Sequence, residues 1–244
     1  EVLKFNGMTY DFDTSVDRSG TYSLKWEEAG DALPMWVADM EFQTAPQIRA
    51  ALQQRLDHGI FGYSIVPPEW NQAYVDWWHR RHNLDIDLES LVFSTGVVPA
   101  ISSMVRKLTT ANENVLIQTP VYNIFFNSII NNGCRVLESP LEYDGSGHYS
   151  INWADLESKL ADPQTTLMIL CNPHNPVGRI WDRDTLARIG ELCWNHHVTV
   201  ISDEIHCDLT DPGYDYVPFA SVNEQCAMNS VTCMAPTKTF NIAG

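Results

Sequence analysis

The segment 231–244 contains the residue type best suited to covalent chemistry, a lysine that follows an apolar run. A short β-branched and apolar stretch opens the segment, and Pro236, Thr237 and Lys238 follow it. Such a stretch is typical of a buried strand. Burial disfavours the charged form of a lysine at the end of a strand, and the neutral amine can form a Schiff base with an aldehyde. An ordinary loop lysine is the alternative, so this interpretation depends on other parts of the chain.

A possible phosphate site lies at Thr95, Gly96 and Val97, where a predicted strand meets a predicted helix. The free backbone N–H groups of a helix N-terminus and the helix dipole favour an anion. The sequence here matches neither the glycine pattern of dinucleotide-binding folds nor a Walker loop, which favours a single phosphate monoester. A simple tight turn is the alternative.

Three more candidate side chains follow predicted strands. Asp203 could pair with a protonated ring nitrogen, although a helix cap or a metal site shared with His206 would use the same residue. Asn175 lies between two prolines that restrict the backbone, and its amide can both donate and accept hydrogen bonds. A rigid turn is the alternative there. Tyr122 could stack on an aromatic ring or could belong to the core.

The elements that must position these groups alternate between strands and helices. We expect strands at 91–95, 115–119, 134–137, 166–171, 198–202 and from 231, and helices from 97, at 121–131, at 152–160 and from 182. Continuous apolar strands that alternate with helices are typical of an α/β domain with a mostly parallel sheet. Ligands of such sheets bind beyond the carboxyl ends of the strands, where all five candidate groups lie.

Two further helices are expected before the first of these strands. Thr44 and Gln47 match a capping box at the start of one helix, and the other covers about 68–82. Asn152 and Asp182 are expected to cap the later helices at 152–160 and from 182.

Length and composition restrict the class of protein. The 244 residues are sufficient for one large domain or two small ones. The net charge of −16 argues against nucleic acid or an anionic membrane as a partner. No apolar run is long enough to span a bilayer, and no signal-peptide pattern opens the chain, so we expect a cytoplasmic protein. The chain begins without Met and stops within an apolar stretch, so we expect both ends to be cut.

The six cysteines contain no CxxC pair, and several of them lie in apolar runs. We therefore expect reduced and mostly buried thiols rather than a disulfide framework or a zinc site.

Together, the candidate groups specify one ligand. A phosphate site, a carboxylate for a ring nitrogen, an amide for a ring hydroxyl, an aromatic ring for stacking and a lysine for an aldehyde match pyridoxal 5′-phosphate. We expect no metal ion in this site.

Three motifs resemble those of the fold type I aminotransferase superfamily. They are His174–Gly178, which is similar to its HNPTG motif, Ser202–His206, which is similar to its D-x-x-Y region, and Thr237–Phe240, which is similar to its lysine motif. Within the superfamily, the segments 33–42, 202–208 and 238–244 resemble the cystathionine β-lyases of the MalY/PatB type. The resemblance extends over nearly the whole chain.

The resemblance implies a role for each candidate residue. Lys238 would hold the cofactor and then act as a general base. Asp203 would keep the pyridine nitrogen protonated. Asn175 would bind the ring hydroxyl oxygen, and Tyr122 would stack on the ring.

The resemblance also implies how the phosphate is held. Gly96, Val97 and Thr237 would bind it within one chain, and Tyr63 would reach the phosphate of a partner subunit in a homodimer. Two departures from the superfamily pattern concern this site. Ala235 stands where many relatives have a serine, and His206 stands where many aminotransferases have a tyrosine.

The implied fold is a large three-layer α/β/α domain with a mostly parallel sheet over residues 44–244. An N-terminal arm or small-domain segment over residues 1–43 would precede it, and the small C-terminal domain would follow Gly244. The implied reaction is a β-elimination that cleaves cystathionine-type or cysteine-type amino acids to a thiol, pyruvate and ammonia. An aminotransferase on the same scaffold and a non-catalytic regulatory protein remain as alternatives.

Overall fold

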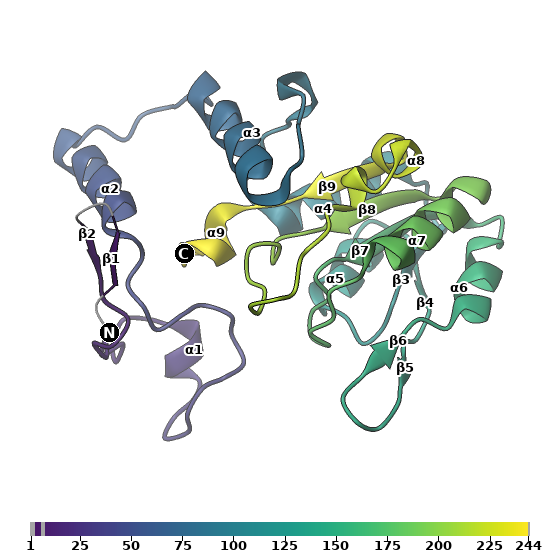
Figure 1. Ribbon diagram of the computed structural model, residues 1–244, viewed down its shortest axis with the longest axis horizontal. Coiled ribbons are helices and arrows are strands. Elements are labelled where there is room, and N and C mark those ends of the chain that lie inside the picture. Colours follow the sequence, from purple (N-terminus) through teal and green to yellow (C-terminus); the bar gives the residue numbers. More distant parts are fainter. Residues whose placement is uncertain (1–2, 6–7, 244) are drawn as a thin grey trace. The chain divides into compact units, whose positions relative to one another are not determined.

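The structure is a computed structural model that describes residues 3–5 and 8–243 of the chain. It divides into two compact units (Figure 1). The first unit comprises Glu1–Ile65 and Pro236–Gly244, and the second comprises Val66–Ala235. The predicted division of the chain into an arm over residues 1–43 and a large domain over residues 44–244 stays a prediction.

The second unit is built on a five-stranded sheet in the order β4-β3-β7-β8-β9. Its strands are β3 Asn114–Ile117, β4 Arg135–Glu138, β7 Thr165–Cys171, β8 Thr199–Asp203 and β9 Ser230–Cys233. All four neighbouring pairs are parallel. This confirms the predicted parallel sheet and brings the carboxyl ends of the strands to one edge.

The helices of this unit lie before and between the strands, and the sequence predicted all of them except the short helix at 224–228. They are α3 Pro68–His82, α4 Val97–Leu108, α5 Ile124–Ile130, α6 Trp153–Leu160, α7 Arg183–Asn195 and α8 Glu224–Met228, with short 3-10 turns η1 Leu88–Ser90 and η2 Phe219–Ser221. Two very short strands, β5 Glu142–Tyr143 and β6 Tyr149–Ser150, form a separate hairpin. No helix in the described part of the chain is long and apolar enough to cross a membrane.

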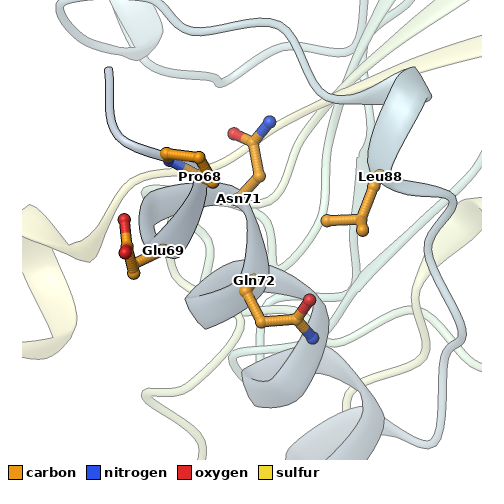
Figure 2. A pocket seen from close by; sticks show the side chains of 5 residues that line it. All are labelled: Pro68, Glu69, Asn71, Gln72 and Leu88. Atoms are coloured by element: carbon orange, nitrogen blue, oxygen red, sulfur yellow. The ribbon is translucent and has the colours of Figure 1, made fainter. Parts of the chain in front are cut away.

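A pocket lies beside the first turn of α3. It is lined by Pro68, Glu69, Asn71, Gln72 and Leu88 (Figure 2). None of the residues that the sequence singles out for chemistry lines it.

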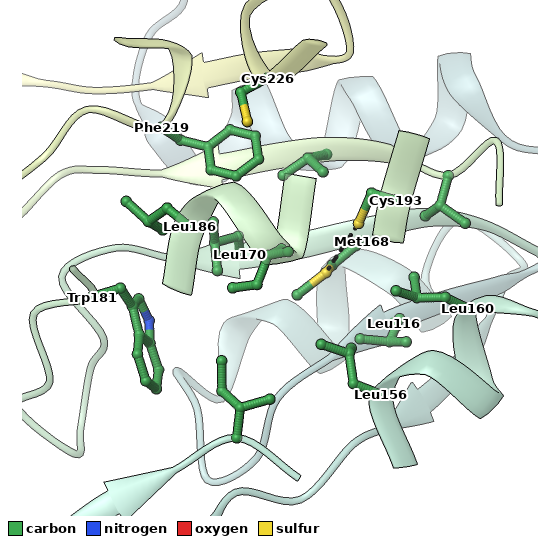
Figure 3. Close-up of a cluster of buried hydrophobic side chains, with 14 of the residues drawn as sticks. Leu116, Leu156, Leu160, Met168, Leu170, Trp181, Leu186, Cys193, Phe219 and Cys226 are labelled. Atoms are coloured by element: carbon green, nitrogen blue, oxygen red, sulfur yellow. Dashed lines mark hydrogen bonds between the residues drawn. The ribbon is translucent and has the colours of Figure 1, made fainter. Parts of the chain in front are cut away.

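Each face of the sheet is buried in its own hydrophobic cluster. Met168 and Leu170 of β7 pack with α6, α7 and α8 on one face (Figure 3). Ile169 and Cys171 of the same strand pack with α4 and α5 on the other face. Alternate residues of a strand point to opposite faces, so the sheet lies between two helical layers. The predicted three-layer α/β/α architecture is confirmed.

Helix caps in this unit also follow the prediction. The Asn152 side chain accepts a hydrogen bond from the N–H of Asp155 at 3.0 Å, and Asp182 accepts one from Thr185 at 2.7 Å. The six cysteines are all free and buried, as expected for reduced thiols.

The predicted strand at 91–95 is wrong. These residues form no strand, and the side chains of Val92 and Phe93 are exposed. The preference of a residue for strands depends mainly on its packing against neighbouring strands. No strand in the described part of the chain pairs with this segment.

The first unit contains β1 Leu3–Phe5, β2 Met8–Tyr10, α1 Leu24–Glu27, α2 Pro46–His58 and α9 Pro236–Thr239. Strands β1 and β2 form an antiparallel pair. A polar cluster holds the loop before α2, where the Lys25 ammonium donates to the carbonyl of Asp39 and pairs with Glu41.

The predicted capping box of α2 is also wrong. The N-cap is Ala45, and no side chain caps the helix. Thr44 precedes the N-cap by one residue, and its hydroxyl donates instead to the carbonyl of Phe240 at 2.6 Å. Gln47 reaches the hydroxyl of Tyr10.

Candidate active site at the carboxyl edge of the sheet

Asp203 is the last residue of β8, and its side chain is buried. In register, it lies between Cys171 of β7 and Cys233 of β9. Its carbonyl accepts a hydrogen bond from the N–H of Asn172 at 2.9 Å, and its carboxylate accepts one from the N–H of Ile205 at 3.2 Å. A fixed carboxylate therefore stands at the carboxyl end of an inner strand, as the sequence predicted.

The charge of Asp203 acts on three neighbouring side chains. Burial raises the pKa of Tyr122, of Cys171 and of Cys233, and the negative charge of Asp203 raises each of them further. These side chains therefore converge on the face of the sheet that α4 and α5 cover. The Tyr122 ring also contacts Phe125 of α5 edge to face, with ring centroids 5.8 Å apart.

The N-terminus of α4 lies on the same face. Val97 is buried in one cluster with Val121, Cys171 and Cys233. Gly96 is the N-cap, and its φ of +152° is a backbone conformation that favours glycine. No side chain caps this end, and the first N–H groups of an α-helix have no partner within the helix. The end of α4 can therefore accept an anion, which is the chemistry predicted for Gly96 and Val97.

Asn175 lies in the turn that follows β7. Its backbone N–H donates to the sulfur of Cys171 at 3.3 Å, and the residue is half-buried. The turn is tied to the neighbouring strand end because the buried His174 ring donates from Nε2 to the carbonyl of Pro120 at 3.0 Å. Burial lowers the pKa of His174 to about 4, so this ring is neutral at pH 7.

Thr237, Lys238 and Tyr63 belong to the first unit. Thr237 and Lys238 are half-buried in α9, and Tyr63 is fully exposed in the loop after α2. The Asn241 side chain accepts from the N–H of Met40 at 2.9 Å and donates to the carbonyls of Met40 and Phe42. Two of the segments singled out in the sequence, 33–42 and 238–244, are thus joined directly.

Asp203 and His206 do not belong to any possible metal-binding group found among the described residues. In the described part of the chain, the residues that gather in a possible metal set are His82, Cys207 and Asp208. Asp208 already accepts hydrogen bonds from the Trp77 indole at 3.0 and 3.2 Å and pairs with His82 at 3.0 Å.

Sequence reasoning missed Glu204, which follows Asp203. Its side chain is fully buried and accepts hydrogen bonds from Ser202, Tyr216 and the N–H of Phe219. The available signal was the pair of adjacent acidic residues at the end of a buried strand. Strand alternation predicts that one of them points to each face of the sheet.

Comparisons with known proteins identify the family of the chain. The sequence profile of the aminotransferase class I and II family matches residues 34–244. The chain is 50% identical over 240 residues to cystathionine β-lyase PatB of Bacillus subtilis, covering 96% of this chain and 62% of that protein. It is 37% identical over 220 residues to protein MalY of Escherichia coli, covering 87% of this chain and 56% of that protein.

Solved structures of pyridoxal 5′-phosphate proteins also match the chain. Cystalysin of Treponema denticola, which contains pyridoxal 5′-phosphate, superimposes with a TM-score of 0.91 at 38% identity, covering 97% of this chain and 62% of that one. The cofactor-bound C–S lyase of Staphylococcus hominis gives a TM-score of 0.89 at 34% identity, covering 97% and 61%. The chain therefore spans less than two thirds of the length of these relatives.

Proposed function

The chain belongs to the aminotransferase class I and II family, and from this membership we propose that the whole protein is a pyridoxal 5′-phosphate-dependent carbon–sulfur β-lyase. Its substrate is a cystathionine-type or cysteine-type amino acid, and its products are a thiol, pyruvate and ammonia. The observation that carries the proposal is the buried Asp203 carboxylate at the end of β8, on the same sheet face as Tyr122 and the N-terminus of α4. The 50% identity to a cystathionine β-lyase supports the choice of reaction.

The groups of the second unit fit this cofactor. The end of α4 offers backbone N–H groups for a phosphate, and Asp203 offers a carboxylate for a ring nitrogen. Asn175 has a side-chain amide for the ring hydroxyl oxygen, and Tyr122 has a ring that can stack. Bound there, the cofactor supplies an electron sink for the carbanion that forms at the substrate Cα.

The site residues have separate roles in the reaction. Asp203 holds a proton on the ring nitrogen, which keeps the ring electron-withdrawing. Lys238 anchors the cofactor through its amine and later takes the proton from the substrate Cα. Thr237 adds a hydroxyl donor for the phosphate. In the sequence, Lys238 comes five residues after Cys233, the β9 neighbour of Asp203.

We also propose that the protein is a cytoplasmic homodimer in which residues 1–43 form an arm and residues 44–244 belong to the large domain. Six free, buried cysteines suit a reducing compartment. Exposed large apolar side chains in the first unit, at Phe61, Tyr63 and Ile65 among others, suit burial against a second copy. A homodimer would bring Tyr63 of one protomer to the phosphate of the other.

The test is product analysis of the whole protein loaded with pyridoxal 5′-phosphate. With cystathionine, we expect pyruvate and ammonia in equal amounts, and no reaction in Lys238→Ala. Lys107→Ala, which removes an exposed lysine at the end of α4, serves as the control and should retain activity. A new amino acid formed from an added keto acid, without pyruvate, would show an aminotransferase instead.

A second measurement tests the attachment residue. Borohydride reduction of the loaded protein followed by peptide mapping should place the cofactor on Lys238. A label on any other lysine would contradict the assignment, and no label at all would favour a non-catalytic protein.

A further inference from the structure

Glu204 is a buried carboxyl group whose environment differs from that of Asp203 beside it. Its side chain is fully buried and forms no ion pair in the part of the chain that the structure describes. Burying such a group is costly unless hydrogen bonds compensate it. The Ser202 hydroxyl at 2.7 Å, the N–H of Phe219 at 3.0 Å and the Tyr216 hydroxyl do so, and the Asn172 amide also favours the charged form of Glu204. Replacing a buried charged group with a hydrophobic residue of similar volume is often neutral or stabilising, so the presence of a carboxyl group here raises the question of a specific role.

Asp203 and Glu204 leave the end of β8 toward opposite faces of the sheet. Asp203 acts on Tyr122 on the face covered by α4 and α5. Glu204 reaches Tyr216 and Phe219, and Phe219 belongs to the cluster on the other face. The two carboxyl groups therefore share one stretch of backbone but different environments.

The backbone between them is held on both sides. The carbonyl of Asp203 accepts from the N–H of Asn172 after β7, and the N–H of Glu204 donates to the carbonyl of Cys233 in β9, each at 2.9 Å. A rotation of the 203–204 peptide would break both bonds. Because the Glu204 side chain is fixed to segment 216–219, it opposes that rotation.

We propose that Glu204 is a positioning residue that holds the Asp203 carboxylate in its direction toward the cofactor ring. This inference rests on the proposed function for its catalytic consequence, but not for its structural part. Ser202, Tyr216 and the N–H of Phe219 hold Glu204, and Glu204 holds the strand end from which Asp203 projects.

The experiment compares Glu204→Gln and Tyr216→Phe with two matched controls in the whole protein. Glu191→Gln removes an exposed carboxylate of α7, and Tyr214→Phe removes an exposed hydroxyl near Tyr216. Tyr216→Phe is the milder change because it deletes one donor and keeps the ring, so it serves if Glu204→Gln does not fold.

Three readouts follow. In the cofactor-free protein, amide hydrogen exchange at Glu204 and Ile205 should become about tenfold faster, which corresponds to about 1.4 kcal/mol of lost protection. In the loaded protein, kcat should fall about tenfold with KM unchanged, because Asp203 acts mainly on the transition state. The pH midpoint of the cofactor absorbance change should also shift, since it depends on the charge beside the ring. The controls should change none of these.

A lower melting temperature with unchanged exchange, unchanged pH midpoint and unchanged kcat would overturn the inference, because it would leave Glu204 a purely stabilising role. If the wild-type protein binds no cofactor, the proposed function fails by itself. In that case, amide hydrogen exchange at Glu204 and Ile205 is the only test of the inference. Faster exchange in the variants supports the anchoring role, and unchanged exchange overturns it.

Discussion

His174 is buried as a neutral imidazole, and this makes the stability of the fold depend on pH. Burial lowers its pKa from 6.5 to about 4. Between these values the unfolded chain binds a proton that the folded chain does not, so stability falls as the pH drops below about 6.5. At pH 5 we expect a loss of about 2 kcal/mol relative to pH 8. Urea unfolding at both pH values measures it.

The matched variants for this prediction are His174→Gln and His148→Gln. His174→Gln keeps a donor for the carbonyl of Pro120 but has no titratable ring, so its stability should change less between pH 8 and pH 5. His148 is exposed, and its replacement should leave the pH dependence as it is in the wild type. An equal pH dependence in His174→Gln would show that another group is responsible.

Asp203→Asn separates the two uses of the carboxylate at the end of β8. An amide keeps the size of the side chain and one acceptor oxygen, but it replaces the other oxygen with an NH2 donor and carries no charge to hold a proton on a ring nitrogen. We expect kcat for cystathionine cleavage to fall about 100-fold, with a much smaller change in the cofactor Kd. Steady-state kinetics and a spectroscopic cofactor titration measure the two quantities. Weak binding combined with normal turnover of the bound enzyme would disprove this role.

At the scale of single residues, the sequence was informative where a polar side chain follows an apolar run. Asp203 and Asn175 both follow such runs, and parallel strands bring their carboxyl ends to one edge. Tyr122 follows the apolar strand β3 in the same way.

The predicted cap at Thr44 was wrong because α2 begins one residue later than the sequence pattern suggests. Thr44 therefore lies before the N-cap, and its hydroxyl donates to the carbonyl of Phe240 instead. Glu204 was missed because its partners Tyr216 and Phe219 are far along the chain.

At the scale of elements, α7 and α8 approach each other closely at Gly190. A Cβ atom at this position would lie 2.3 Å from the sulfur of Cys226 and 3.5 Å from the ring of Phe219. Gly190→Ala should therefore destabilise the protein by about 1–3 kcal/mol, although alanine favours a helix more than glycine does. Chemical denaturation measures the change.

The double variant Gly190→Ala/Cys226→Ala tests the cause. Removing the sulfur gives the new methyl group space, so the double variant should be more stable than the sum of the two single changes predicts. Strict additivity would show that the cost arises elsewhere in the helix.

The five strands of the central sheet and the longer helices could be predicted from the sequence because each buried strand is one continuous apolar run. The segment 91–95 has the same composition and yet forms no strand. A strand needs a neighbour for its backbone hydrogen bonds, and local composition does not reveal the neighbour. Helices α4 to α7 between the predicted strands could be predicted, whereas the β5–β6 hairpin, α8 and the lack of a pairing partner for this segment could not.

At the scale of the whole molecule, the proposed homodimer makes each active site depend on both chains. The Tyr63 side chain is fully exposed, beside Phe61 and Ile65, which are also exposed. If Tyr63 of one protomer donates to the phosphate in the other, Tyr63→Phe should weaken cofactor binding about 10- to 100-fold. This follows from the 1.5–3 kcal/mol that a hydrogen bond to a charged group is worth. A cofactor titration measures it, and Tyr22→Phe, which removes another exposed hydroxyl, is the control.

Mixing Lys238→Ala with Tyr63→Ala tests whether the site is shared, at a cofactor concentration low enough to leave Tyr63→Ala unloaded and therefore inactive. In a mixed dimer of Lys238→Ala and Tyr63→Ala chains, one site has both defects and the other has none. Random exchange at equal amounts makes half of the dimers mixed, so about a quarter of the wild-type activity should return. A mixture of Lys238→Ala and Asp203→Asn should regain nothing, because both residues would serve the site of their own chain. Recovery in neither mixture, although subunit exchange is verified by mass, would place Tyr63 outside the active site.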